Sequence, residues 1–339
     1  MADNPQTLAL VTLAQNFRGN TVRQVNRRAA ALRLFPIVRG EGKNCAFVPE
    51  STGQLAENYT EGADAANFGS DAQASATLSW GLYRSNFRVT ELAMDASSTS
   101  RTPEGNLRLW ARNLVNSSAA LASHLNGEIF AGPGTGTRMA GLGVAIGDDT
   151  NTYATIDRAA QSFWRPTVVD PGALTAPTFA LIRDDLRKIF EASGMMPDIA
   201  LCSPAVFNKV AGLFDSNRRW IQEVTTARGL VRLDFGYQGL EVDGCVFVKD
   251  KDATANQIFY VNTNHVRLEV LPSAAQEAML ALIGESVVPA DDGFGAIPLG
   301  FKYEKLAKTG PFDKAQILST LQLVCDRPNA CGVRKNVAV

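Results

Sequence analysis

Apolar residues recur at helical spacing in the stretch that runs from Thr102 to Phe130. The positions that mark one face lie three, four or seven residues apart, namely Leu107, Trp110, Leu114, Leu121, Leu125 and Ile129. Thr102-Pro103-Glu104 is a strong helix start, because it supplies an N-cap, a first-turn proline and an acid near the positive helix end. Gly132-Pro133-Gly134 ends the pattern. We therefore expect a helix over 103–130, about 40 Å long at 1.5 Å per residue, packed on a sheet.

Shorter elements follow this helix. Thr178–Ser193 has a second helical pattern that stops at Gly194, and Pro204–Leu213 begins with a proline that suits a first turn. Strand patterns occur at Tyr153–Ile156, Phe163–Val169, Pro197–Cys202, Gly239–Val248 with a turn at Asp243-Gly244, and Gln257–Leu271 with a break at Asn262–Asn264. Together these patterns predict an α+β fold whose strands concentrate in the second half of the chain.

The first 83 residues are divided by charge. Residues 1–45 carry seven Lys or Arg against two acids, a net charge of +5, with helical stretches at Thr7–Gln15 and Thr21–Leu34. Residues 46–83 carry five acids and no base, a net charge of −5, and a strand pattern follows from Thr77 to Glu91. We interpret the first segment as an extended arm and the second as a protruding hairpin. Their opposite charges suit a contact between subunits; the alternative is two solvated segments of chance composition.

Three sets of residues are candidates for contacts with other molecules. The arm set is Arg18, Arg23, Arg27, Arg28 and Arg33, and the hairpin set is Glu50, Glu57, Tyr59, Glu61, Asp64, Phe68 and Asp71. The third set combines aromatic residues with adjacent arginines, as interaction hot spots do, and consists of Phe214, Asp215, Arg218, Arg219 and Trp220. The alternative for the third set is an ordinary loop with Trp220 in its own core.

Composition narrows the class of protein. The 339 residues include 33 Lys and Arg against 34 Asp and Glu, and the resulting net charge of −1 excludes a globally basic nucleic-acid binder. A hydrophobic fraction of 45% excludes wholesale disorder, and the length predicts about two domains. The first residues do not resemble a secretory signal, and no stretch approaches the roughly 18 apolar residues of a membrane span. Five cysteines without a CxxC pair indicate reduced thiols that mostly fill core positions.

Sites for catalysis, cofactors or metals are not apparent. His124 and His265 are the only histidines, and no GxSxG motif occurs. The glycine cluster Gly132–Gly143 lacks the lysine of a phosphate-binding loop and follows a helix instead of a strand, so we interpret it as a flexible linker. Asp291-Asp292-Gly293 lacks the remaining ligands of a calcium loop. We expect no enzymatic activity, no catalytic residue, no cofactor and no metal site.

The order of these segments resembles that of a known family. Basic arm, sparse hairpin, long helix, glycine-rich turn and helix–strand domain follow one another as in tailed-bacteriophage major capsid proteins of the Hong Kong 97-type fold. The segments that look like parts of that family are ATIDRAAQSFWRPTVVD (Ala154–Asp170), GMMPDIALCSPAVFNKV (Gly194–Val210), the strands of Gly236–Pro272 and QLVCDRPNACGVRKN (Gln322–Asn336). Their order and spacing extend the resemblance over nearly the whole chain.

The resemblance implies a division into four parts. Residues 1–45 would be the N-terminal arm and residues 46–95 the extended loop. The peripheral domain would comprise 96–165 and 268–325, with its spine helix at 103–130. The axial domain would comprise 166–267 and 326–339, and the loop Phe214–Trp220 would lie in it.

The resemblance also implies a function. Such a protein self-assembles as pentamers and hexamers into an icosahedral shell around packaged double-stranded DNA. It is a virion component that assembles in the bacterial cytoplasm, without a membrane. The implied partners are other copies of the chain, a separate scaffolding protein, a portal, a cement protein and non-specifically bound DNA. Alternatives are an encapsulin-like nanocompartment shell with the same fold, a minor head protein and a cytosolic α+β enzyme.

One variant of the family can be tested on the sequence. Some relatives join their subunits by an isopeptide bond from a lysine of the extended loop. No lysine occurs between Lys43 and Lys188. We therefore expect a shell without that crosslink.

Overall fold

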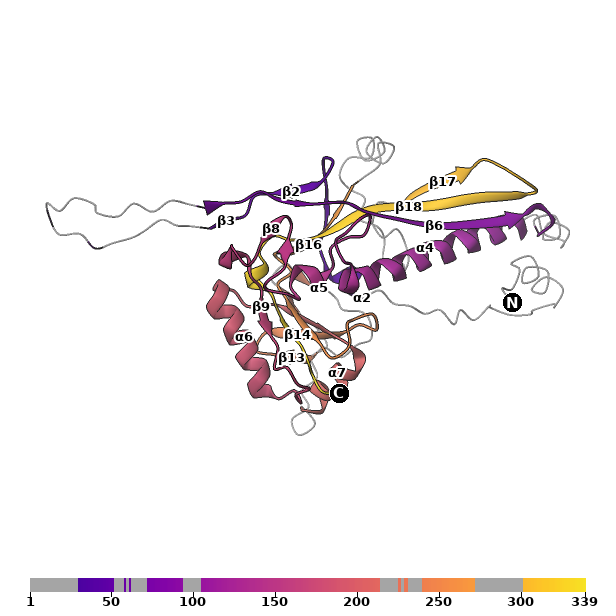
Figure 1. The fold of residues 1–339 in the computed structure, drawn as a ribbon. Helices are drawn as coiled ribbons and strands as arrows, with labels where there is room; N and C mark the ends of the chain where they lie inside the picture. The colour runs from indigo at the N-terminus through magenta and orange to yellow at the C-terminus, as the bar shows by residue number, and fades with distance from the viewer. Residues whose placement is uncertain are drawn as a thin grey trace. The chain divides into compact units, whose positions relative to one another are not determined.

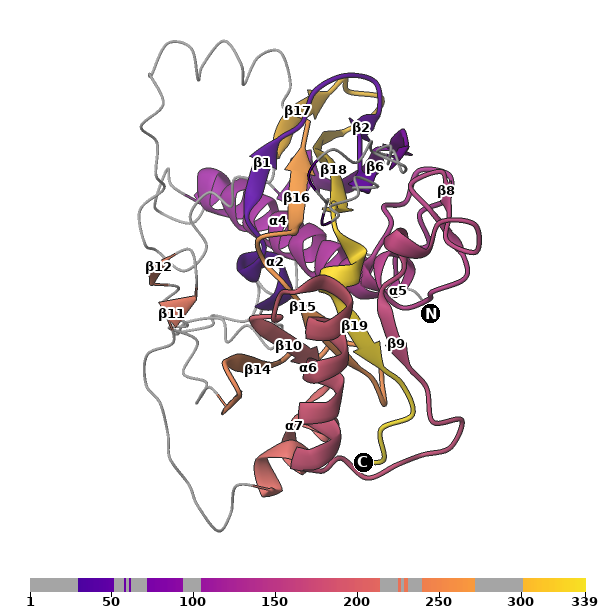
Figure 2. The same ribbon diagram turned by 90° about the vertical axis from the view of Figure 1, so that its left-hand side faces the viewer.

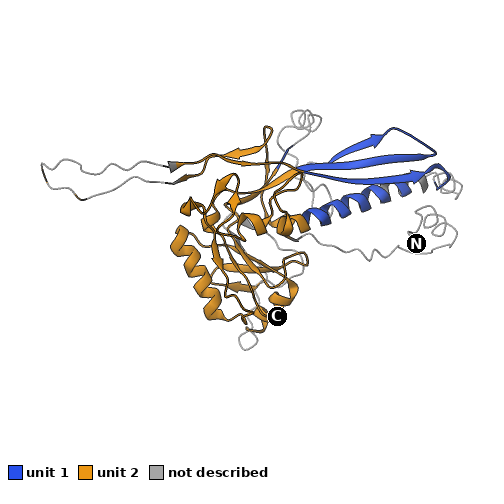
Figure 3. Cartoon of the chain, in the orientation of Figure 1, with its two compact units in different colours: residues 1–29, 82–126, 270–320 blue, residues 30–81, 127–269, 321–339 orange. Residues whose placement is uncertain are grey.

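The computed structural model describes residues 30–51, 58, 61, 72–93, 105–213, 225–226, 229–230, 240–271 and 301–339. The chain divides into two compact units, shown in blue and orange in Figure 3. The first unit takes Met1–Ala29, Leu82–Asn126 and Val270–Thr320, and the second takes Ala30–Gly81, Gly127–Glu269 and Leu321–Val339. Each unit therefore combines segments that are far apart in the sequence.

The first unit contains long antiparallel strands and most of the longest helix (Figure 1). Strand β6 (Gly81–Thr90) pairs with β18 (Phe312–Cys325), and β18 also pairs with β17 (Lys302–Leu306). The β17–β18 register runs from Lys302 opposite Leu318 to Leu306 opposite Lys314. Helix α4 (Gly105–Ala131) begins in this unit and continues through the boundary at residue 126.

Side chains of β6 fix the helix to the sheet inside the first unit. The ring of Phe87 lies 4.9 Å from that of Trp110, and the ring of Tyr83 lies 5.7 Å from that of His124. Burial alternates along β6: Tyr83 and Val89 are buried and Ser85 and Phe87 half-buried, whereas Arg84, Asn86 and Arg88 between them are exposed. Successive side chains of a strand point to opposite faces, so one face of this sheet receives the helix.

The second unit contains a six-stranded mixed sheet. In order across the sheet, its strands are β13 (Leu240–Val242), β14 (Cys245–Lys249), β10 (Ile199–Cys202), β15 (Ile258–Val261), β19 (Gly332–Arg334) and β9 (Thr167–Val169). The pairs β10–β14 and β19–β9 are parallel, and the other pairs are antiparallel. Helices α6 (Phe179–Ser193) and α7 (Pro204–Gly212) pack on this sheet, as Figure 2 shows, and share one apolar core with it.

The second unit also contains a two-stranded antiparallel β-ribbon, formed by residues 45–51 and 72–78 and called the ribbon below. Strand β2 (Cys45–Phe47) pairs with β5 (Ala76–Leu78), and β3 (Glu50–Ser51) pairs with β4 (Ala72–Gln73).

The remaining described elements are short: α2 (Ala30–Leu34), β1 (Ile37–Arg39), α5 (Leu142–Ala145), β7 (Thr152–Tyr153), β8 (Ile156–Asp157), η1 (Ser162–Trp164), β11 (Thr225–Thr226), β12 (Gly229–Leu230), β16 (Val266–Val270) and η2 (Pro328–Ala330). β1 pairs with β16, which pairs with β18.

Several predicted elements are confirmed at their predicted ends. The helix expected over 103–130 is α4, although its predicted start at Thr102 lies outside the described residues. Helix α6 is capped by Thr178, whose Oγ1 accepts the Leu181 N–H at 3.3 Å, and ends at Gly194 with a φ of 71°. The turn at Asp243-Gly244 joins β13 to β14, and both residues have positive φ.

Three predictions about local structure were wrong. The strand expected at Phe163–Val169 begins only at Thr167, because Ser162–Trp164 forms a 3-10 turn that buries the Trp164 indole. Tyr153–Ile156 is not one strand but the turn of the β7–β8 hairpin. The Gly132–Gly143 linker is not open: its ends are joined by the Gly141 N–H, which donates to the Gly132 carbonyl at 2.9 Å. Of the two predicted arm helices, only Ala30–Leu34 lies within the described residues, and it is helical.

Candidate assembly surfaces

The base of the ribbon is fixed on the indole of Trp164. This side chain is 2% exposed and stacks on the ring of Tyr153 at a centroid distance of 6.0 Å. Its Nε1–H donates to the Tyr153 carbonyl at 3.2 Å. The ring of Phe47, on β2, lies 6.0 Å from the indole. Because the buried Trp164 packs on Tyr153 and contacts Phe47, strand β2, at the start of the predicted extended loop, is fixed to η1 and the β7–β8 hairpin.

The returning strand of the ribbon is held by the β7–β8 turn. The Thr77 N–H donates to the Ala154 carbonyl at 3.0 Å, and the Thr155 hydroxyl donates to the Ser75 carbonyl at 3.2 Å. Ala154 and Thr155 have φ values of 52° and 67°. Such conformations are uncommon for residues other than glycine. Here the turn presents its backbone and hydroxyl to the ribbon, so both ribbon strands are tied to the same hairpin.

Arg158 supports this hairpin from inside the second unit. Its guanidinium donates to the carbonyls of Val144, Ala145 and Asp148, and it lies 5.0 Å from the centroid of the Tyr153 ring. Burial lowers the pKa of Arg158, and the neighbouring Tyr153 partly opposes that shift. The carbonyls come from α5 and the turn after it, so Arg158 joins the glycine-rich turn to the base of the ribbon. Sequence reasoning assigned Arg158 no role, although it belongs to the segment that carried the family resemblance.

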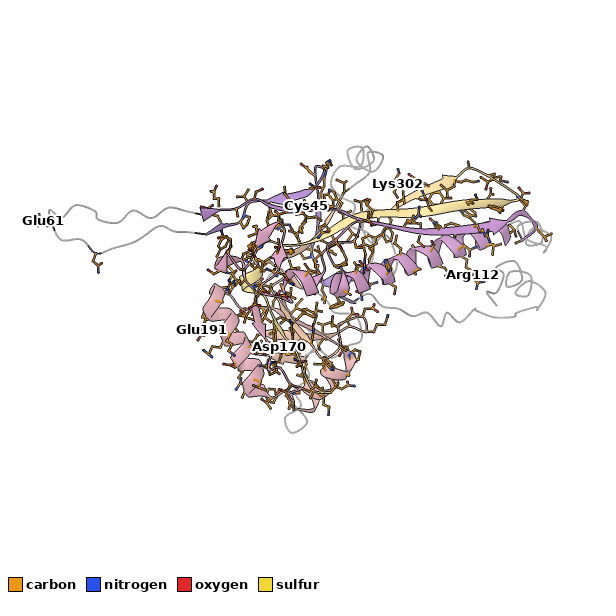
Figure 4. The ribbon with its side chains drawn as sticks, in the orientation of Figure 1. Cys45, Glu61, Arg112, Asp170, Glu191 and Lys302 are labelled. Carbon is orange, nitrogen blue, oxygen red and sulfur yellow. The ribbon has the colours of Figure 1, made fainter. Side chains whose placement is uncertain are left out.

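Few of the predicted contact residues are described. Arg33 is exposed on α2, Glu50 is exposed at the start of β3, and Glu61 is exposed in the predicted extended loop (Figure 4). The structure does not test whether these residues meet other subunits. The remaining members lie outside the described residues: Arg18, Arg23, Arg27, Arg28, Glu57, Tyr59, Asp64, Phe68, Asp71, Phe214, Asp215, Arg218, Arg219 and Trp220.

The first unit carries basic side chains on its strands to which sequence reasoning assigned no role. Arg84 and Arg88 lie at alternate, exposed positions of β6. The charged ends of Arg88 and Lys314 lie 5.6 and 4.9 Å from the centroid of the Phe312 ring. Lys302 and Lys314 share one sheet face with Glu304, because Lys302, Glu304 and Leu306 alternate along β17 and Lys314 lies opposite Leu306. Glu304 pairs with Lys302, so the charge of Lys302 on this face is compensated.

Charged groups inside the second unit are paired with one another. Asp326 accepts a hydrogen bond at 2.8 Å from His265 Nδ1 and another at 2.6 Å from Arg267. Burial alone would raise the pKa of Asp326, but these two partners outweigh it and hold the pKa below its usual value. Both partners come from the β15–β16 region, so this network fixes the turn before η2 and leaves no carboxylate oxygen of Asp326 without a partner.

Nothing in the described residues suggests a reaction centre. All five cysteines are buried and unpaired, and burial raises the pKa of the Cys202 thiol to about 12. A protonated thiol is a poor nucleophile, so the prediction that the cysteines fill the core is confirmed. In the described part of the chain, no group of three or more His, Cys, Asp or Glu is placed to hold a metal ion. The helices described there are too short or too polar to cross a bilayer.

Solved structures confirm the predicted fold. The capsid asymmetric unit of cyanophage A-1(L) is similar with a TM-score of 0.70 and 18% identity, over 94% of this chain and 95% of that chain. A chain of Mycobacterium phage Bobi is similar with a TM-score of 0.55 and 14% identity, over 96% of each chain. The SrpI encapsulin complex of Synechococcus elongatus PCC 7942 is similar with a TM-score of 0.58 and 11% identity, over 97% of this chain and 95% of that chain. Identities this low show the fold, α+β of the Hong Kong 97 type, and do not separate capsids from encapsulins.

Comparison with protein families distinguishes capsid proteins from encapsulins for this chain. No curated protein matches the chain. Residues 41–338 match the family described as SU10 major capsid protein. This match confirms the predicted role as a non-enzymatic structural component of a bacteriophage virion, because major capsid proteins act by self-association into a shell. From residue 41 to residue 338, the chain belongs to the SU10 major capsid protein family.

Proposed function

We propose that this capsid protein assembles as pentamers and hexamers into an icosahedral shell that encloses packaged double-stranded DNA. The observation that carries the proposal is the ribbon base on Trp164, at which the acidic segment 46–83 begins. A segment with few core residues gains apolar and ionic contacts only from another molecule. Closed point-group symmetry repeats such a contact around each capsomer.

The proposed division of labour follows the family. Residues 1–45 act as the arm and 46–95 as the extended loop. The peripheral domain consists of 96–165 and 268–325, and the axial domain of 166–267 and 326–339. The axial loop with Phe214, Arg218, Arg219 and Trp220 faces the centre of the capsomer.

The arm and the loop attract each other through opposite charges. Residues 1–45 carry +5 and residues 46–83 carry −5. Changing Arg23, Arg27 and Arg28 together to Gln tests this proposal. Reduced shell yield supports pairing between arm and loop. Shells of normal yield that differ only in DNA content or in the salt sensitivity of DNA retention assign the arm to DNA instead.

The proposed partners are a separate scaffolding protein, a portal, a cement protein and DNA, and assembly takes place in the bacterial cytoplasm. The loop has no lysine with which to crosslink. Arm–loop contacts and the cement protein therefore stabilise the shell. Purified particles should give monomeric chains on a denaturing gel, and a ladder of crosslinked species would contradict this proposal.

A further inference from the structure

The turn of the β7–β8 hairpin contains two residues in a conformation that favours glycine. Tyr153 pairs with Ile156, so Ala154 and Thr155 form a two-residue turn. Their φ values are 52° and 67°. A two-residue turn with two positive φ values favours Asn-Gly, and a β-branched side chain at positive φ is a genuine outlier. Strained residues persist only where the surrounding structure holds them, so a specific contact should account for Thr155.

That contact is with the outer edge of the ribbon. Strand β5 pairs with β2 on one edge, and the β7–β8 turn lies on its other edge (Figure 1). The Thr77 N–H of β5 donates to the Ala154 carbonyl at 3.0 Å. The Ser75 carbonyl, directly before β5, accepts from the Thr155 hydroxyl at 3.2 Å. The turn therefore satisfies a donor and an acceptor of this edge, as a neighbouring strand would.

The hydroxyl of Thr155 lies among oxygens of both the turn and the ribbon. Besides the Ser75 carbonyl, Thr155 Oγ1 lies 2.5 Å from the Ala154 carbonyl oxygen and 3.3 Å from the Thr77 hydroxyl. A hydroxyl can donate its proton to a carbonyl and also accept a proton from a second hydroxyl. Glycine at position 155 would relieve the strain of the turn but would remove this group. The residue that suits the turn best is therefore not the residue that holds the ribbon.

Packing does not fill all the space beside the ribbon. A pocket of about 400 Å³ lies next to Pro49 and Glu50, between the ribbon, η1 and the turn that contains η2. Atoms that border empty space lack van der Waals partners on that side. Strand β2 is anchored by the ring of Phe47, which contacts Trp164. Thr155 supplies the corresponding anchor for β5, so each strand at the base of the ribbon has its own attachment.

We infer that Thr155 is a positioning residue for assembly, whose hydroxyl holds the ribbon in the orientation in which it contacts a second copy of the chain. The inference rests on the proposed function and names a residue that prepares one contact surface. The ribbon exposes Val48 and Glu50, an apolar and an acidic side chain that another copy can contact. A surface that is already oriented loses less conformational freedom on binding, and a symmetric shell repeats this gain in every subunit.

The test compares glycine at the two turn positions in the full chain, expressed with its neighbouring genes. Thr155→Gly should raise the protein concentration needed for assembly about fivefold, the equivalent of one hydrogen bond. Its thermal unfolding midpoint should fall by less than about 2 °C, because relieved strain offsets the lost bond. Ala154→Gly is the matched control, since it relieves similar strain and keeps the Thr155 hydroxyl; it should change the threshold by less than about twofold. Thr155→Ser keeps the hydroxyl and should assemble like the wild type.

Hydrogen exchange below the assembly threshold measures the hold on the ribbon directly. The Thr77 amide should exchange about fivefold faster in Thr155→Gly than in the wild type, Ala154→Gly or Thr155→Ser. Assembly of Thr155→Gly at the wild-type threshold would overturn the inference. Equal effects of the two glycine variants would also overturn it, because they would assign the change to flexibility of the turn. A wild-type chain that forms no shell contradicts the proposed function instead, and the exchange rates then still decide whether Thr155 holds the ribbon.

Discussion

Arg334 donates two hydrogen bonds to the carboxylate of Asp185 inside the core of the second unit. The Nε–Oδ2 and Nη2–Oδ1 distances are 2.5 and 2.6 Å, and the Tyr260 hydroxyl donates to Oδ2 at 3.1 Å. The two charged side chains are 5% and 1% exposed. Burial raises the pKa of Asp185, and its partners oppose that shift. Because Asp185 lies on α6 and Arg334 on β19, the pair sets how this helix sits on the sheet.

Removal of one partner should therefore be costly. Asp185→Ala leaves the Arg334 guanidinium buried without a counter-charge, and we expect a loss of about 3–5 kcal/mol in the free energy of unfolding. The control is the next carboxylate toward the N-terminus, Asp184, which pairs with Arg187 and Lys188 on the surface of the same helix. Asp184→Ala should give no measurable change. Urea unfolding of the unassembled chains, followed by circular dichroism, compares the two, and equal effects would contradict this account.

Arg158→Met should also destabilise the second unit. The variant leaves the buried carbonyl of Ala145 and the partly buried carbonyls of Val144 and Asp148 without their donor, which should cost about 2 kcal/mol. Lysine should not restore stability, because a single ammonium lacks the planar fork that serves three acceptors. The same urea measurement applies, with the exposed Arg183→Met as a control. Wild-type stability of Arg158→Lys would contradict the assigned geometry.

Substitution by alanine should have opposite effects on the free energy of unfolding at Gly141 and at Gly127. A Cβ at Gly141 would lie 2.5 Å from the Glu128 carbonyl oxygen and 2.7 Å from that of Ile129, so Gly141→Ala forces the backbone apart and should cost about 1–3 kcal/mol. At Gly127, within α4, a Cβ meets nothing within 4 Å. Gly127→Ala should instead add about 0.5–1 kcal/mol to the free energy of unfolding. Thermal unfolding of both variants is the measurement, and a shift of the same sign in both would refute the packing described for this turn.

The Asp326 network predicts a specific response to acid. A carboxyl whose folded pKa is depressed adds stability above its unfolded value near pH 4, and that stability is lost as the pH falls through the lower folded pKa. Arg267→Met removes one cause of the depression. The variant should therefore lose less free energy of unfolding than the wild type between pH 5 and pH 3. Identical losses would show that Asp326 is not held in its ionised form by this network.

Local signals in the sequence predicted the elements whose ends are set by local chemistry. The cap at Thr178, the left-handed Gly194 and the apolar stripe of α4 all act within a few residues, and each predicted element is present. The predictions that were wrong concern segments decided by distant partners. Trp164 is buried because its ring packs against those of Tyr153 and Phe47. Both lie at least eleven residues away in the sequence, so the residues next to Trp164 do not indicate its burial.

The glycine-rich turn was misread for the same reason. Its residues look like a linker because they lack large side chains. The turn is nevertheless closed, since Gly132 and Gly141 allow two backbone segments to touch and Arg158 binds the carbonyls of the short helix that follows. The pocket beside Glu50 was equally beyond local signals, because it is formed by three segments that come together only on folding.

Negative-stain electron microscopy of the chain, expressed with and without its neighbouring genes, tests the central claim most directly. Membership of a major capsid protein family and the fixed base of the ribbon predict closed shells or rings of capsomers, whose diameter would limit the triangulation number. Small particles of uniform size, with the full set of genes present, would contradict the account.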